Sequence, residues 1–359
     1  MTRRDGIEPR TASEQAQRTA DAREVYTFQP LPTPPGAAPY RLSTTALDIA
    51  PSSGTRTLHL IGDHGGIANP KPQAAVAAAM VADLTDHPEV ALCYSVGDLV
   101  YFNGAGGEYP PQFFEAYAHY LRTIVGIPGN HDGDPEEDGE ASLQAFVKYL
   151  CDQQAPRLLP EMAEFNRDTV QQPNVYWTLE DDAFTIIGLY TNVPSGGQVE
   201  ADQQAWFEAE LAAAPTDRPL IVALHHPPYS CDAMHGGSIH MGELLDKAFD
   251  SAKRCPQLIV SGHVHDYQRF ERKAWGVTIP YLVIGASGYH NLHKLAKEAH
   301  DGMAVTSDTT FEFGEDQGWG FLRLVVGKSG VSGEYIGVDE DGQVTPAIDT
   351  FSYPFAAAA

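Results

Sequence analysis

The amino-acid sequence predicts an α/β fold, in which strands and helices alternate along the chain. Two observations support this prediction. From about residue 55 onward, short apolar runs of strand length alternate with stretches of helical character. Several of these apolar runs also lead through a glycine to polar side chains, and open α/β sheets bind their ligands at the carboxyl ends of the strands.

The predicted strands are short apolar runs bounded by polar or turn-forming residues. They span residues 58–61, 90–96, 123–127, 184–189, 220–224, 258–260 and 281–284. Helices are expected between them, where alanine is abundant or apolar side chains recur at helical spacing. The expected helices span residues 73–84, 112–122, 201–211 and 242–254. Residues 320–326 and 332–338 are predicted to form a β-hairpin that closes a sheet.

We expect one large α/β domain over residues 55–346, between an N-terminal arm over 1–54 and a C-terminal tail over 347–359. The arm has a helical-looking stretch at 12–24 and then becomes proline-rich, which predicts an extended linker. The end of the tail, from Ser352, is expected to be frayed. No signal-like apolar segment begins the chain and no apolar run is long enough to span a bilayer, so a cytoplasmic protein is expected.

The charge balance is strongly acidic, with 48 Asp and Glu against 23 Lys and Arg and a formal net charge of −25. Such a surface repels polyanions over long distances, so we expect neither nucleic acid nor membrane as a partner. An anionic substrate would have to be attracted by strong positive charge inside its site. The four cysteines include no CxxC pair, which excludes zinc-ribbon and thioredoxin-like sites and favours reduced thiols. The oligomeric state is unknown from the sequence.

Five of the predicted strands lead to residue types that bind metal ions. In order, the segments are Gly62-Asp63, Gly97-Asp98 with Tyr101 three residues later, Gly129-Asn130-His131, His225-His226 and Gly262-His263-Val264-His265. The carboxyl ends of such strands share one edge of a sheet. Carboxylate, phenolate and amide oxygens together with imidazole nitrogens form a ligand set for metals. The sequence therefore predicts a metal site at this edge.

Each segment alone has a simpler interpretation. A Gly-Asp pair after a strand also forms turns and helix N-caps, and Gly-Asn-His-Asp could be only a turn. His263 and His265 are more informative, because residues two apart in an extended segment point to the same side, and both would need partners in a core. The joint occurrence of all five segments, in order, favours the metal site.

The order of these motifs resembles that of the metallophosphoesterase (calcineurin-like) superfamily over about residues 57–290. The motifs read Asp63-His64-Gly65, Gly97-Asp98-Leu99-Val100-Tyr101, Gly129-Asn130-His131-Asp132, Val222-Ala223-Leu224-His225 and Gly262-His263-Val264-His265. Most members have a histidine where this chain has Gly65, and here Tyr101 is available instead, which is the signature of purple acid phosphatases. The stretches 62–66 and 233–236 look most like the small, tartrate-resistant type.

The resemblance implies a fold and a ligand set. The fold would be a four-layer αββα sandwich of two mixed β-sheets flanked by helices, with the metal site at the C-terminal edges of the strands. The first metal would be held by Asp63, Tyr101 and His265, the second by Asn130, His225 and His263, and Asp98 would bridge the two. The family's first metal is Fe(III), and its second is Fe(II), Zn(II) or Mn(II). A tyrosinate on Fe(III) would give a visible charge-transfer colour, because an unperturbed tyrosine ionises only near pH 10.

The same resemblance implies catalytic and substrate-binding residues. His131 and His235 would contact the phosphate or protonate the leaving group, with Asn130 also binding substrate and His240 as the rival of His235. Other polar residues near the motifs have simpler interpretations. His64 and His226 are expected to point away from the ligands, His290 and His293 to lie at the rim, and Asp134–Asp138 to form a solvated acidic loop.

The expected function is the hydrolysis of small phosphate monoesters, in which a metal-bound hydroxide attacks phosphorus. A phosphodiesterase, including the cyclic nucleotide type, is the alternative, because both would share one metal core. If Tyr101 were only a buried structural residue, the site would be a zinc or manganese phosphodiesterase with one ligand fewer. A non-catalytic metal-binding regulator would need a damaged core, and all the ligand positions are filled. The N-terminal arm is too short for the β-sandwich domain of plant-type purple acid phosphatases.

Overall fold

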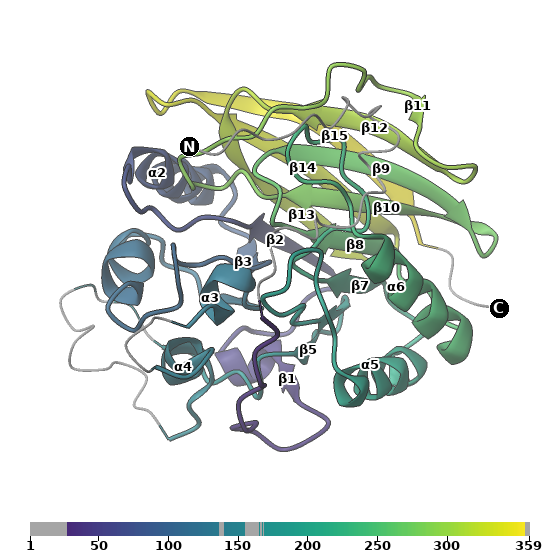
Figure 1. Ribbon diagram of the computed structural model, residues 1–359, viewed down its shortest axis with the longest axis horizontal. Helices are drawn as coiled ribbons and strands as arrows, with labels where there is room; N and C mark the ends of the chain where they lie inside the picture. Colours follow the sequence, from purple (N-terminus) through teal and green to yellow (C-terminus); the bar gives the residue numbers. More distant parts are fainter. Residues whose placement is uncertain (1–26, 136–139, 155–164, 166, 168, 356–359) are drawn as a thin grey trace.

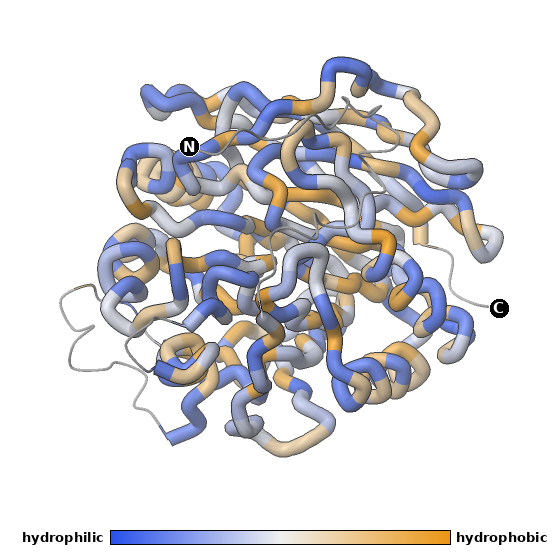
Figure 2. The backbone as a smooth tube through the Cα atoms, in the orientation of Figure 1, coloured by the Kyte–Doolittle hydropathy of each residue, from blue (hydrophilic) through white to orange (hydrophobic). Residues whose placement is uncertain are grey.

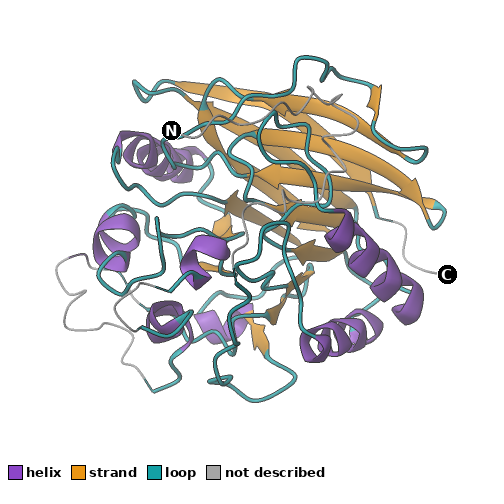
Figure 3. Ribbon diagram, in the orientation of Figure 1, coloured by secondary structure: helices purple, strands orange, loops and turns teal. Residues whose placement is uncertain are grey.

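The structure is a computed structural model that describes residues 27–135, 140–154, 165, 167 and 169–355. Two mixed β-sheets lie face to face and helices cover their outer faces (Figure 1, Figure 3), which is the four-layer α/β arrangement that was expected. No helix in the described ranges is both long and apolar enough to cross a membrane. The stretch 12–24 and residues 136–138 of the acidic loop lie outside the described residues.

The two sheets contain nine and six of the described strands. In spatial order, the first consists of β1 (Arg41–Ser43), β5 (Trp177–Glu180), β6 (Thr185–Gly188), β7 (Leu220–Ala223), β8 (Leu258–Ser261), β10 (Val277–Ile284), β9 (Tyr267–Ala274), β12 (Thr309–Glu315) and β11 (Met303–Ala304). The second consists of β15 (Val344–Pro354), β14 (Gly330–Val338), β13 (Trp319–Gly327), β2 (Thr55–Ile61), β3 (Val90–Ser95) and β4 (Ile124–Gly126). Every strand expected from the sequence is present.

Both sheets have a parallel part that points its carboxyl ends at the same edge of the molecule. In the six-stranded sheet, β2, β3 and β4 are parallel. In the nine-stranded sheet, β6, β7, β8 and β10 are parallel. The remaining described pairs are antiparallel except that of β1 and β5. Parallel strands are normally covered on both faces, and the helices provide that cover here.

The core consists of two layers separated by the nine-stranded sheet. In β7, Ile221 and Ala223 belong to the layer between the sheets, whereas Leu220 and Val222 belong to the layer beneath the helices. Successive side chains of a strand point to opposite faces, so a strand buried on both faces has a continuous apolar sequence. Figure 2 shows this as hydrophobic colour along the central strands.

The three longest described helices, of 16, 13 and 14 residues, lie on the outer faces of the sheets. The described α-helices are α2 (Lys71–Asp86), α3 (Asn130–Gly133), α4 (Gln144–Phe146), α5 (Ala201–Ala213) and α6 (Ile239–Ala252). Helix α2 packs on β13 and β14, and α5 and α6 pack on each other and on the nine-stranded sheet. Helix α6 begins after Ser238, whose hydroxyl accepts a hydrogen bond from the Met241 amide as an N-cap.

The helix expected over residues 112–122 is wrong in its second half. In this segment the structure has a short π-helix, η2 (Pro110–Glu115), followed by turns. The carbonyl groups of Tyr117 and Tyr120 accept hydrogen bonds from the buried guanidinium of Arg167, at 3.1 and 2.7 Å. These carbonyls therefore have partners without a continued helix.

The expected frayed terminus from Ser352 is also wrong for Ser352–Pro354, because these residues lie in β15. The strand was missed because an inward-facing position carries a charge. Asp349 is buried and accepts hydrogen bonds from Arg269 at 2.7 Å and Tyr267 at 2.8 Å. Strands β1 and β15 come from the expected arm and tail, and the domain boundaries otherwise stay a prediction. All four cysteines are unpaired.

Candidate metal centre

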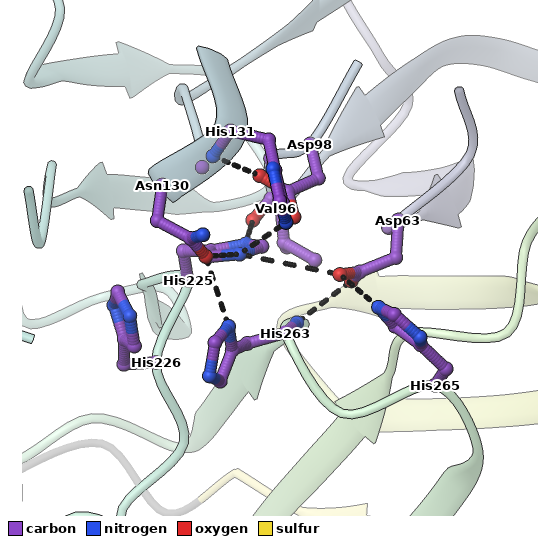
Figure 4. Close-up of polar contacts among 12 residues, drawn as sticks. Asp63, Val96, Asp98, Asn130, His131, His225, His226, His263 and His265 are labelled. Carbon is purple, nitrogen blue, oxygen red and sulfur yellow. Dashed lines mark hydrogen bonds and ion pairs between the residues drawn. The ribbon is translucent and has the colours of Figure 1, made fainter. Parts of the chain in front are cut away.

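The loops that follow β2, β3, β4, β7 and β8 meet where the two sheets end together, and their side chains point into a common space (Figure 4). Three of these residues have a left-handed backbone conformation, with φ of 53° at Asp63, 53° at Asp98 and 69° at His263. Such a conformation costs about 1–2 kcal/mol for a residue other than glycine. Gly97, with φ of 109°, lies so close to the next loop that a Cβ would be 2.6 Å from the Gly129 amide. These turns aim the side chains of both sheets at one place.

One end of the cluster contains Asp63, Tyr101 and His265. The Tyr101 hydroxyl donates a hydrogen bond to Oδ1 of Asp63 at 3.2 Å and lies 3.3 Å from Nε2 of His265. That Nε2 is 3.6 Å from the same carboxylate oxygen. Nδ1 of His265 donates to the carbonyl of Asn291 at 3.0 Å. This hydrogen bond leaves Nε2 as the nitrogen that faces the cluster.

The other end contains Asn130, His225 and His263. Oδ1 of Asn130 lies 2.9 Å from Nδ1 of His263 and 3.1 Å from Nε2 of His225. The other nitrogen of His225 donates to the carbonyl of Val96 at 2.9 Å, so Nε2 again faces the cluster.

Asp98 borders both ends. Its Oδ2 is 3.3 Å from Nε2 of His225, which is also 4.0 Å from Oδ1 of Asp63. One ligand atom from each of Asp63, Asp98 and His225 lies within 4.8 Å of the others. The structure therefore brings all seven side chains of the expected ligand set together, in the two groups that the resemblance implied.

The cluster combines two buried carboxylates with imidazole rings, and no described Lys or Arg pairs with these carboxylates. Asp63 and Asp98 are fully buried, and none of their hydrogen bonds or ion pairs with described residues involves Lys or Arg. Burial raises the pKa of Asp63 well above its ordinary value. Burial lowers the pKa of His225, but the carboxylates of Asp98 and Asp63 outweigh this effect and raise it to about 9. Buried charge is costly unless it is paired or binds a metal.

A further observation indicates that these residues are suited to bind metal ions. Oδ2 of Asp98 is buried and accepts no hydrogen bond from the described residues. Burial, followed by the carboxylates of Asp63 and Asp98, raises the pKa of Tyr101 well above its ordinary value, so its phenol is neutral without a cation. Oxygen donors of this kind beside imidazole nitrogens suit divalent and trivalent transition metals.

His131 lies beside the cluster, and its backbone and ring are both held in place. Its amide donates to Oδ1 of Asp98 at 2.9 Å. Its Nδ1 donates to the carbonyl of Phe102 at 2.5 Å, and its ring is 4.5 Å from that of Tyr101. Nε2 is therefore the nitrogen that can meet a substrate.

The other expected substrate residues differ in their placement. The ring of His235 lies 5.2 Å from that of His263, so His235 borders the cluster. His240 is exposed in the first turn of α6, and no contact among the described residues links it with the cluster. The geometry therefore favours His235 over His240 as the residue that contacts the substrate.

Three neighbouring histidines lie outside the expected ligand set and have polar partners of their own. His64 is buried against Phe113 and Tyr117, and its Nε2 lies 3.0 Å from the Ser95 hydroxyl. Nδ1 of His226 lies 2.7 Å from the Thr191 hydroxyl, although its ring is 4.3 Å from that of His263. The expected rim position of His293 is wrong, because this side chain is buried.

Sequence reasoning missed the partners of His293 and Tyr101. Nδ1 of His293 lies 3.0 Å from Oδ2 of Asp232, and Tyr289 stacks on Tyr101 at 3.9 Å between centroids. Only the pairing of two loops joins Asp232 with His293, through a bridge between Asp232 and Leu295. A single sequence carries no signal for such a pairing.

Asp132 holds the loop of Asn130 and gives a pH-dependent prediction. Its carboxylate accepts hydrogen bonds from the amides of Gly129 and Leu99 and from Tyr109. Burial and the nearby Asp98 raise its pKa to about 7. The pKa of Asp132 in the folded protein thus lies above its ordinary value near 3.9. The contribution of the protonated Asp132 carboxyl to stability is therefore complete below about pH 4 and is lost as pH rises towards 7. In chelated protein, Asp132→Asn should reduce the fall in melting temperature between pH 5 and pH 8. An unchanged fall would contradict this assignment.

The sequence model of the calcineurin-like phosphoesterases matches residues 56–267, which is more than half of the chain. The matched region contains all seven side chains of the cluster. The chain therefore belongs to the calcineurin-like phosphoesterase family. Membership of this family implies a binuclear metal centre.

Three curated relatives carry two kinds of name. A probable cyclic nucleotide phosphodiesterase of Rhodopseudomonas palustris is 26% identical over 207 residues, covering 54% of this chain and 64% of the relative. Purple acid phosphatase 22 of Arabidopsis thaliana is 30% identical over 121 residues, covering 32% and 25%. A cAMP/cGMP dual specificity phosphodiesterase of Mycobacterium tuberculosis is 27% identical over 168 residues, covering 46% and 44%. The chain thus spans less than two thirds of each relative.

Solved structures share the fold at low sequence identity. GAP50, described as the anchor in the inner membrane complex of Plasmodium, matches with a TM-score of 0.59 at 13% identity, over 85% of this chain and 90% of that chain. PhoD matches with a TM-score of 0.55 at 12% identity, over 90% and 72%. At these identities the likeness supports the fold alone.

Proposed function

We propose that this protein hydrolyses small phosphate monoesters with a two-metal centre, in the manner of a purple acid phosphatase. The observation that carries this proposal is the meeting of seven metal-binding side chains in two groups, with Asp98 bordering both. Membership of the phosphoesterase family supports the reaction class. The net charge of −25 supports a small substrate rather than a nucleic acid or an anionic membrane.

The proposed metal ligands follow the two groups. Asp63, Tyr101 and His265 would hold Fe(III), Asn130, His225 and His263 would hold Fe(II), Zn(II) or Mn(II), and Asp98 would contact both. The raised pKa of Tyr101 supports a strong Lewis acid at the first position, because only such a cation makes this phenol a ligand. When bound, the two metals supply an activated water and neutralise charge on the phosphate oxygens.

The chain's own residues would bind and orient the ester. His131 uses Nδ1 for the Phe102 carbonyl, so Nε2 would contact a phosphate oxygen or the leaving oxygen. His235, beside His263, would contact the phosphate from the other side of the cluster. The Asn130 amide would serve both a metal and the substrate. Groups fixed before the reaction stabilise developing charge without reorganisation.

A phosphodiesterase, including one that acts on cyclic nucleotides, is the second candidate, because two relatives carry that name. The test compares the rates of an aryl phosphate, a bis-aryl phosphate and a cyclic nucleotide with metal-loaded protein. We expect the monoester to react at least about tenfold faster, which is about 1.4 kcal/mol of transition-state discrimination. Faster diester hydrolysis would favour the second candidate. If the protein hydrolysed none of these esters, the remaining interpretation would be a metal-binding regulator without catalytic activity.

The proposed ligand role of Tyr101 predicts a spectroscopic change. Tyr101→Phe should abolish the visible absorption band of iron-loaded protein and keep part of the activity, because the other ligands remain. Tyr289→Phe is the matched control, since Tyr289 stacks on Tyr101 without belonging to the ligand set. A visible spectrum that survives Tyr101→Phe would contradict the ligand role.

A further inference from the structure

A second buried polar group lies beside the metal cluster, and the proposed reaction does not use it. Asp232 and His293 are 0% and 3% exposed. Oδ2 of Asp232 lies 3.0 Å from Nδ1 of His293. The same oxygen accepts a hydrogen bond from the backbone amide of His235 at 2.7 Å. One carboxylate oxygen therefore holds both histidines.

The ring of His293 packs against two rings of the site. Its centroid is 4.9 Å from that of His235 and 4.3 Å from that of His265. The ring of His235 in turn lies 5.2 Å from that of His263. The four rings therefore form a continuous row that begins and ends at proposed metal ligands.

The backbone around this row is fixed independently of the two side chains. The Ala233 amide donates to the Lys294 carbonyl at 2.8 Å, and the Ala296 amide donates to the Cys231 carbonyl at 2.8 Å. The amide of His293 donates to the carbonyl of His265 at 3.0 Å. Because these bonds set the course of both loops, the bond between Asp232 and His293 mainly determines the orientation of the rings.

The pair is costly as a purely structural feature. Oδ1 of Asp232 is buried without a hydrogen-bond partner among the described residues. A buried polar atom without a partner costs about 1–3 kcal/mol, and apolar residues of similar size would avoid this cost. Local features that lower stability concentrate at functional sites.

We propose that Asp232 and His293 form a positioning pair for His235. The inference rests on the proposed function, in which His235 contacts the substrate phosphate. Asp232 fixes the backbone of His235 and the ring of His293, and that ring restricts the ring of His235. A displacement of about 1 Å in a catalytic arrangement can lower the rate about 100-fold.

The test is a double-mutant cycle with His293→Phe and His235→Ala. His293→Phe keeps a ring in the row and removes the nitrogen that binds Asp232. Alone it should lower kcat about 10- to 100-fold with an unchanged metal content, and the melting temperature should fall somewhat because the buried Asp232 loses a hydrogen-bond partner. In the His235→Ala protein the same change should lower kcat less than about twofold, since a pair that acts through His235 has nothing left to position.

Two further variants sharpen the cycle. Asp232→Asn can still accept a hydrogen bond from the His235 amide, so it should lose less activity than Asp232→Ala. His300→Phe is the control, because His300 is an exposed histidine whose ring lies 3.2 Å from the Asp301 carbonyl and forms no hydrogen bond with the other described residues. It should behave as the unmodified protein. Equal losses for Asp232→Asn and Asp232→Ala would contradict the role of the amide contact.

A binding measurement separates this inference from the proposed function. Titration of metal-loaded protein with inorganic phosphate should show about tenfold weaker binding for His293→Phe, and only when His235 is present. If the unmodified protein hydrolyses no ester, the proposed function fails, and the phosphate titration still tests the pair. Equal losses with and without His235, no loss in either protein, or loss of metal from His293→Phe would each overturn the positioning role.

Discussion

Asp98→Asn is expected to lower kcat on a phosphate ester by at least about 100- to 1,000-fold, a loss comparable with removal of one oxyanion-hole donor. Asp98 is the carboxylate that borders both ligand groups, and its buried Oδ2 accepts no hydrogen bond from the described residues. An amide has the same shape and tolerates the left-handed backbone at this position. The loss should therefore reflect changed metal binding rather than a changed fold. Elemental analysis should find fewer than two metal ions per chain.

The matched control for Asp98 is Asp202→Asn, which changes an exposed carboxylate in the first turn of α5. This variant should keep the metal content and the turnover of the unmodified protein. Full metal occupancy together with full activity in Asp98→Asn would show that Asp98 does not contact the metals.

Removal of the metals is expected to lower the melting temperature by roughly 10 °C. A ligand that binds only the folded state at about 1,000 times its Kd stabilises that state by about 4.1 kcal/mol. Domains of somewhat smaller size shift by about 2–4 °C per kcal/mol. The physical reason is that Asp63 and Asp98 are fully buried beside each other, and a cation compensates their charge. The comparison requires thermal unfolding of chelated and metal-loaded protein at one pH and one salt concentration.

Asp98→Asn also provides the control for this stability measurement. If the metals stabilise the fold through the cluster, chelation should change the melting temperature of this variant much less than that of the unmodified protein. An equal change in both proteins would mean that the stabilising metal binds elsewhere.

The parts of the fold that the sequence predicted are the strands buried on both faces. In β7 and β8, both faces contact apolar layers, so the apolar run itself marks the strand. Strands β9 and β15 were not predicted because charged residues occupy them. In the structure Arg269 of β9 and Asp349 of β15 pair with each other in the interior. Such a partnership depends on two segments about 80 residues apart, which a local pattern does not reveal.

The same distinction applies to the site. The seven expected ligands follow strand ends, and strand ends of parallel sheets converge by geometry, so their meeting was predictable. Asp232 and His293 lie several residues beyond the ends of the predicted strands 220–224 and 281–284, and their contact depends on hydrogen bonds between the two loops. The choice between His235 and His240 likewise depended on ring contacts rather than on sequence spacing.

The ligands come from both sheets, since β2, β3 and β4 lie in one and β7 and β8 in the other. The two metal ions would therefore link the two sheets at the edge where the ligand loops meet. Separation of the sheets would break the metal coordination, and loss of the metals would weaken the packing of one sheet against the other. Metal release and global unfolding of the loaded protein would then coincide in a single cooperative step, without a half-open species that keeps its ions.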